Sequence, residues 1–106
     1  MSYKRTMESV KATVQQELIL AVEQWGLFHS QHEAYAVTLE EVEEAKAEME
    51  ELTDALDEYW STVRCNHSAL ALALIKDIEN TGYRLACEAI QVAAMAKKTR
   101  IMLEGE

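Results

Sequence analysis

The sequence predicts a single all-α domain, residues 1–106, built from three long helices that form an oligomeric helical bundle. There is no proline and there are only three glycines, so the chain lacks the turn formers that the many hairpins of an all-β fold need. Apolar residues recur at spacings of three and four over most of the length, as on one face of a helix. The apolar fraction of 49% is too high for a disordered chain, and this length suits one domain.

The first helix is predicted over residues 2–25. Its apolar residues follow helical spacing: Val10, Val14, Leu18, Val22 and Trp25. Gly26 comes directly after them and is predicted to end the helix, because glycine adopts the left-handed conformation at a C-terminal cap at little steric cost.

The second helix is predicted to begin at Ser30 and to run to Arg64. Ser30 and Glu33 have the spacing of a capping box, in which each side chain bonds a free backbone amide of the first turn. Further along, apolar residues alternate spacings of three and four: Val42, Ala45, Met49, Leu52, Leu56, Tyr59 and Val63. This heptad-like seam is typical of a helix that packs in a bundle.

The third helix is predicted to start after a cap at Asn66 or Ser68 and to run to about Met102, with one possible break at 80–82, Asn-Thr-Gly. Three thin helices bury only a modest share of their surface. Aromatic residues such as Trp60 would then be hard to cover within one chain. We therefore expect a homodimer or homotetramer.

Charge and composition exclude several classes of protein. The net charge of −9 disfavours nucleic-acid binding, which needs a basic surface. The longest apolar run, Ala69–Ile75, is far too short to cross a membrane, and no signal peptide is apparent. Cys65 and Cys87 have no metal-site or redox-motif spacing, so we expect reduced thiols and a cytoplasmic protein. Three scattered glycines also exclude a glycine-rich phosphate loop.

One segment carries the whole charge imbalance. Residues 40–58 contain ten acids and one base, a net charge of −9, and the rest of the chain is neutral. Glu41 and Glu44 are three apart and therefore share one face of the second helix. Relative to the centre of the predicted apolar seam, Glu41 lies about 70° away and Glu44 about 130° away.

A divalent metal would offset the repulsion between these carboxylates. Magnesium prefers carboxylate oxygens and completes its shell with water and substrate phosphates. The third helix offers Glu88 and Gln91, again three apart, with Arg84 one turn before Glu88. The alternative is an ordinary solvated acidic face with no metal.

Two segments resemble a known superfamily. Residues 28–41, FHSQHEAYAVTLEE, followed by Glu44, and residues 88–96, EAIQVAAMA, look like the MazG-like proteins of phages and bacteria. These belong to the all-α nucleoside triphosphate pyrophosphohydrolases. The resemblance covers about residues 25–97. It implies an oligomeric, magnesium-dependent enzyme that cleaves an NTP or dNTP to the monophosphate and pyrophosphate, with manganese as a possible substitute.

The same resemblance implies which residues form the site. Glu41 and Glu44 match the first acidic pair of the ExxE and ExxD signature, and Glu40 matches the extra acid that often precedes it. Glu88 matches the glutamate of the second pair, whereas Gln91 stands where that pair has aspartate. A glutamine oxygen can ligate magnesium but brings no charge. The implied metal ligands are thus Glu41, Glu44, Glu88 and Gln91, and the implied catalytic residues are Glu40 and Glu41.

The triphosphate would also need basic or polar contacts. His32, Arg84 and Lys97 are the predicted substrate-binding residues, and Lys98 and Arg100 are further candidate cations for the triphosphate. The basic residues could instead complement the helix dipole near the third helix's C-terminus, and His32 could be an ordinary polar residue. Two other functions stay open: a non-catalytic helical interaction module, and a relative that binds nucleotide without turnover.

Overall fold

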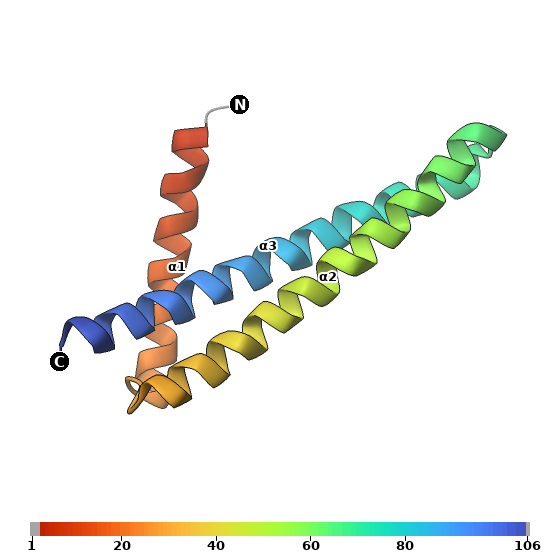
Figure 1. The fold of residues 1–106 in the computed structure, drawn as a ribbon. Coiled ribbons are helices and arrows are strands. Elements are labelled where there is room, and N and C mark those ends of the chain that lie inside the picture. The colour runs from red at the N-terminus through yellow and green to blue at the C-terminus, as the bar shows by residue number, and fades with distance from the viewer. Residues whose placement is uncertain (1–2, 106) are drawn as a thin grey trace.

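The computed structural model describes residues 3–105 and confirms the all-α prediction (Figure 1). It contains α1 (Tyr3–Trp25), α2 (Gln31–Cys65) and α3 (Ser68–Glu104), with no strand among the described residues. α2 and α3 form a long antiparallel hairpin, and α1 crosses α3 near its C-terminal third. The molecule measures 59 × 30 × 20 Å. Within residues 3–105, α1 packs on α3 and not on α2.

The turn between α1 and α2 follows the predicted chemistry at Gly26 and Ser30, whereas the Glu33 side chain pairs with His29 instead of completing the predicted capping box. Gly26 has a φ of +75°, the left-handed region, so it ends α1 as expected. Ser30 is the N-cap of α2, and its hydroxyl accepts a hydrogen bond of 3.1 Å from the Glu33 backbone N–H. The Glu33 carboxylate lies 3.4 Å from the His29 ring nitrogen Nδ1.

The turn between α2 and α3 differs from the prediction. Asn66 ends α2 in the left-handed conformation, with a φ of 55°. His67 is the N-cap of α3, since its Nδ1 accepts a hydrogen bond of 3.2 Å from the Leu70 N–H. The proposed N-caps Asn66 and Ser68 were therefore wrong. An imidazole nitrogen can accept the bond that a serine or asparagine oxygen usually accepts.

α3 is also continuous where a break was predicted at 80–82. Thr81 is 2% exposed, so it lies inside the interface between the helices. The single glycine of this tripeptide destabilises a helix interior by about 1 kcal/mol relative to alanine. Packing against α2 readily outweighs this cost.

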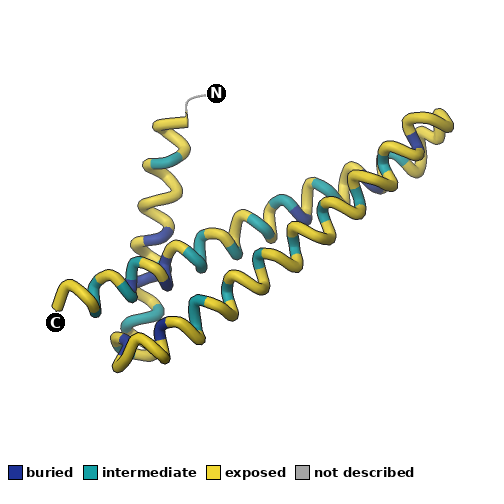
Figure 2. Tube along the Cα trace, in the orientation of Figure 1, coloured by how far each residue is buried: buried dark blue, intermediate teal, exposed yellow. Residues whose placement is uncertain are grey.

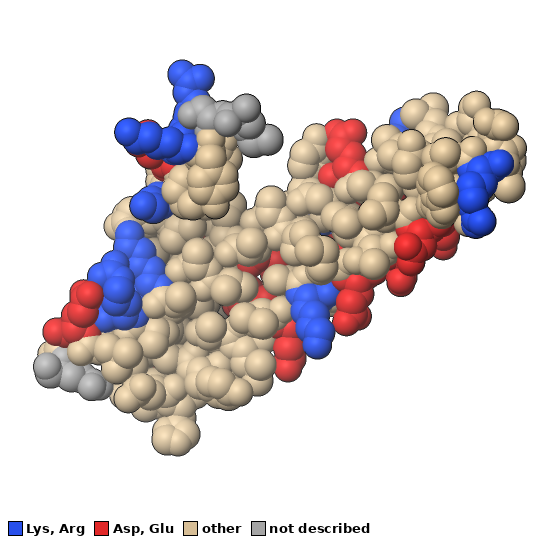
Figure 3. Space-filling model, turned by 45° about the horizontal axis from the view of Figure 1, so that its top comes forward, with Lys and Arg blue, Asp and Glu red and all other residues tan. Residues whose placement is uncertain are grey.

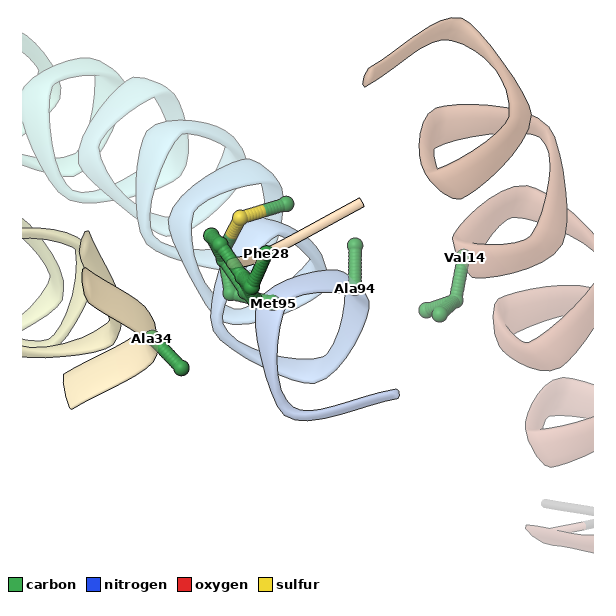
Figure 4. Close-up of a cluster of buried hydrophobic side chains, with 5 residues drawn as sticks. All are labelled: Val14, Phe28, Ala34, Ala94 and Met95. Atoms are coloured by element: carbon green, nitrogen blue, oxygen red, sulfur yellow. The ribbon is translucent and has the colours of Figure 1, made fainter. Parts of the chain in front are cut away.

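The main core lies where α1, the first loop and the start of α2 meet α3 (Figure 4). Its buried members come from all three helices and the loop: Val14, Phe28, Ala34, Ala94 and Met95. Ala94 has no exposed surface, which shows that a small residue lets another element come close to α3. Burial is sparse along the rest of the hairpin (Figure 2).

The face that α2 turns toward α3 differs from the predicted seam. Ala45, Leu52 and Tyr59 are partly buried as expected. The alternate members of the seam are instead 43–50% exposed: Val42, Met49, Leu56 and Val63, here called the α2 stripe. Partly buried in their place are Glu41, Glu48 and Ala55.

The helix is thus rotated by about 60° relative to the prediction. Arg84 of α3 helps to fix this rotation. Its guanidinium donates to Glu48 at 3.1 Å and to Glu51 at 3.4 Å, and both carboxylates lie on the acidic side of α2.

Candidate metal centre and adjoining cavity

Three carboxylates converge between α2 and α3. Glu41 and Glu44 come from one turn of α2 and Glu88 comes from α3, and one oxygen of each lies within 4.8 Å of the others. The rotation of α2 makes this possible. It places Glu41 in the interface and Glu44 at its edge, facing α3 rather than the solvent side that the predicted seam implied. Two segments that are 44 residues apart in the sequence therefore supply one cluster.

Burial and mutual repulsion both disfavour the charged forms of Glu41 and Glu88. Burial raises the pKa of Glu88, and a hydrogen bond to Glu44 and the charges of Glu44 and Glu48 raise it further. Burial also raises the pKa of Glu41, with added contributions from the charges of Glu44, Glu88 and Glu40. The Oε2 atom of Glu88 is buried and, in the part of the chain that the structure describes, has no hydrogen-bond partner. Such an oxygen is costly to bury unless a proton or a cation meets it.

The donor set fits a hard divalent cation. Three carboxylate oxygens on two rigid helices match the preference of magnesium for oxygen ligands. Opposite ligands of magnesium are about 4.2 Å apart, since each bond is about 2.1 Å long. Ligand atoms that already lie within 4.8 Å of one another need only small side-chain rotations to reach that geometry.

Gln91 lies one turn of α3 beyond Glu88 and is tied to α1. Its amide nitrogen donates a hydrogen bond of 2.9 Å to the Glu17 carboxylate. This leaves the Gln91 oxygen as the only atom of its side chain that can ligate a metal. The sequence analysis did not identify Glu17, because nothing in its spacing on α1 relates it to the third helix.

A cavity of about 460 Å³ extends from this region toward the first loop. Glu41 and Gln91 line it together with Phe28, Trp25 and Glu33. Other lining residues are Ala21, His29, Val37, Met95 and Lys98. The cavity therefore joins carboxylates on the hairpin to aromatic side chains at the end of α1 and in the loop.

Lys98 is the buried cation of this cavity. Only 4% of the residue is exposed, and its ammonium lies 4.1 Å from the centroid of the Phe28 ring. Lys97 and Lys98 were both predicted candidates for contact with the triphosphate, and of the two only Lys98 lines this cavity. The signal that separates the two is helical phase, because Lys98 is three residues from Met95 and four from Ala94, which both face the core.

The other predicted substrate-binding residues lie outside the lining of this cavity. His32 borders a shallow hollow with Gln31 and Tyr35. Lys97 donates a hydrogen bond to Gln15 of α1. Arg84 is engaged with acids of α2, as described above, and also donates to Thr81 Oγ1 at 2.9 Å. Glu40 is exposed beside Glu41.

Charge is unevenly distributed over the surface (Figure 3). Acidic side chains line the hairpin, and basic ones gather over α1 and the C-terminal end of α3. None of the described helices is long and apolar enough to span a bilayer.

No family model, curated protein or solved structure matches the chain.

Proposed function

We propose that the chain is a cytoplasmic, magnesium-dependent pyrophosphohydrolase that converts a nucleoside triphosphate to the monophosphate and pyrophosphate. The observation that carries the proposal is the convergence of Glu41, Glu44 and Glu88, with a buried and unpartnered oxygen on Glu88. The adjoining cavity offers room for the rest of a nucleotide. The resemblance of residues 28–41 and 88–96 to MazG-like proteins supports the same reaction.

The roles of the residues follow from their positions. Glu41, Glu44 and Glu88 would hold magnesium, and the Gln91 oxygen is a candidate fourth ligand. When bound, the metal supplies positive charge that offsets the charge of the triphosphate and of the pyrophosphate leaving group. Glu40, exposed beside Glu41, would orient the attacking water and receive its proton. Attack in line on the α-phosphorus forms one P–O bond as the bond to pyrophosphate breaks.

Pyrophosphate release across a nucleotide panel, with magnesium, with manganese and with a chelator, tests the proposal. We expect metal-dependent release from at least one nucleotide. Glu44→Gln should lower turnover by about 100-fold or more, because it removes the negative charge of a metal ligand and loss of supporting residues alone costs 10- to 100-fold.

Glu51→Gln is the matched control. Glu51 lies two turns further along the same edge of α2 and faces Arg84 rather than the cluster, so its turnover should stay near that of the wild type. Absence of metal-dependent release from every nucleotide would rule out the enzyme.

We also propose that the chain self-associates as a homodimer or homotetramer through the α2 stripe. Val42, Met49, Leu56 and Val63 repeat every seven residues, and each is 43–50% exposed. Exposed Leu39 and Trp60 widen the same face. A continuous apolar face with this period is typical of a coiled-coil seam.

Leu56→Lys would place a charge in the middle of this seam. It should shift the protein to monomer in sedimentation experiments, with helix content unchanged by circular dichroism. Glu58→Lys introduces the same side chain on the opposite side of α2 and should leave the assembly intact. A wild type that sediments as a monomer would contradict self-association.

The same exposed face favours a second candidate function, a helical interaction module without catalysis. In that case the carboxylate cluster would bind a cation or a proton for structural reasons alone. Metal-dependent thermal stabilisation without turnover would indicate a relative that binds metal or nucleotide but does not hydrolyse it.

A further inference from the structure

Lys98 has an unusual environment for a charged residue. It is 4% exposed, yet within residues 3–105 its ammonium has no ion-pair or hydrogen-bond partner, and it lies over the Phe28 ring. An ammonium group carries three N–H donors. A π face attracts the charge but satisfies none of these donors in the way that an oxygen would.

The cavity is the open side of this environment. Its lining includes Lys98 with Phe28 beside it, the aromatic Trp25, and Glu41 and Gln91, of which Glu41 belongs to the carboxylate cluster. Along α3, Gln91, Met95 and Lys98 follow one another at turns of the helix. If the triphosphate lies at the cluster, the remainder of the nucleotide lies toward Lys98.

The surroundings of Lys98 suit a base better than a phosphate. Phe28 lies against Lys98, Trp25 also lines the cavity, and aromatic rings provide stacking surfaces for bases. Of the two carboxylates that line the cavity, Glu41 belongs to the cluster and Glu33 already faces the His29 ring nitrogen at 3.4 Å. Lys98 is therefore the strongest unused donor in the aromatic part of the cavity.

We propose that Lys98 donates a hydrogen bond to an exocyclic oxygen of the nucleotide base, so that the cavity selects bases bearing an oxo group and disfavours adenine. Uracil, thymine, guanine and cytosine present such oxygens, whereas adenine presents an amino group and ring nitrogens. An ammonium has no acceptor for the adenine amino group. This inference rests on the proposed function, because it assumes that the cavity receives a nucleotide.

Binding of monophosphates tests the inference without requiring turnover. Trp25 lines the cavity, so its fluorescence should respond when a ligand enters. Trp60 lies on the far part of α2, and a Trp60→Phe background removes its signal. The probes are inosine and adenosine monophosphates, which share a purine ring and differ in carrying an oxo or an amino group at C6.

We expect the inosine nucleotide to bind about tenfold more tightly, the effect of one hydrogen bond to a charged group. Lys98→Met keeps an unbranched apolar side chain that is one atom shorter and should abolish this preference, leaving adenosine monophosphate binding unchanged. Lys76→Met removes one charge from an exposed position of α3 and should leave the preference intact.

Several outcomes would overturn the inference. Equal wild-type affinities for the two probes would do so even if Lys98→Met failed to fold. Equal weakening of both probes and of inorganic pyrophosphate by Lys98→Met would assign Lys98 to the phosphates instead. Failure of the proposed function gives a different result. A binding preference for the oxo base without any pyrophosphate release would contradict the hydrolase activity and still support base recognition by Lys98.

Discussion

The two ends of the α2–α3 hairpin differ in what covers them. At one end, α1 and the first loop close over the hairpin and complete a core that includes Phe28, Ala94 and Met95. At the other end, the far arm, α2 and α3 have only each other, and apolar residues such as Trp60 and Leu72 are 57% exposed. The carboxylate cluster lies between them, just beyond the point where the Gln91–Glu17 hydrogen bond joins α1 to α3.

This difference separates two tasks. The three-helix end builds a cavity with a buried lysine and aromatic walls, which only a site enclosed from several sides can provide. The far arm offers a long apolar face, and its buried polar residues among those the structure describes, Thr62 and Thr81, carry no charge. Chemistry is therefore expected at the covered end, and association at the uncovered stripe of α2.

The largest effect on stability should come from the core of the three-helix end. Met95→Ala removes a side chain that is 7% exposed and should lower the free energy of unfolding by about 2–5 kcal/mol. Leu72→Ala on the far arm should change it by no more than about 0.5 kcal/mol. Chemical denaturation followed by circular dichroism measures both. Similar losses for the two variants would contradict the contrast between the ends.

The next effect concerns the bond that joins α1 to α3. Gln91→Glu would turn the Gln91 amide into a carboxylate facing Glu17 and should lower the free energy of unfolding by about 1–3 kcal/mol. The double variant Glu17→Gln/Gln91→Glu restores a donor opposite an acceptor and should recover most of the loss. A double-mutant cycle measures the coupling.

The double variant Glu17→Gln/Gln91→Glu is also informative about catalysis. It moves a negative charge from position 17 to position 91, where the resemblance implies an acidic residue, and keeps the hydrogen bond between α1 and α3. We expect turnover to rise above that of the wild type. An unchanged rate would show that charge at position 91 does not limit the reaction.

The smallest effect is a pH-dependent one at the cluster itself. The pKa values of Glu41 and Glu88 are raised above 4.5, so the folded protein favours their protonated forms. Their contribution to the free energy of unfolding is therefore fully present below pH 4.5 and is lost as the pH rises through the raised pKa values. In a chelator, Glu88→Gln should therefore melt at a higher temperature than the wild type at pH 7, and the gap should shrink at pH 4.

With magnesium, the wild type should instead melt at a higher temperature than Glu88→Gln, because only the wild type retains all three carboxylates to bind the metal. Thermal melts at the two pH values, with and without metal, measure the effect. A wild type whose melting temperature is indifferent to magnesium would contradict metal binding at the cluster.

Much of the fold could be predicted from local sequence. Gly26 and Ser30 have strong conformational preferences of their own, so the first turn followed the prediction. The turn at Asn66 and His67 did not, because histidine seldom caps a helix and its ability to do so depends on the local geometry. The break at 80–82 was overruled by the burial of Thr81 against α2, which is a tertiary effect.

The candidate site was predictable only in part, for a related reason. Glu41, Glu44 and Glu88 stand out through their spacing and the resemblance. The rotation that brings them together depends on which face of α2 meets α3, and apolar spacing does not select the observed face because that face includes Glu41, Glu48 and Thr62. Glu17 and Lys98 depend on the crossing of α1 over α3, which local sequence does not determine.

The left-handed residue Asn66 has a consequence for how the cluster is assembled. The hairpin closes at Asn66 and His67, and contacts near the turn form at the least cost in loop-closure entropy. Pairing that extends from there must keep its register over about 30 Å of helix before Glu44 reaches Glu88. A single residue inserted within α3 between the turn and Glu88 would rotate the part of the helix beyond it by about 100° relative to α2. The number of helical residues between the turn and the cluster therefore decides whether the three ligands meet.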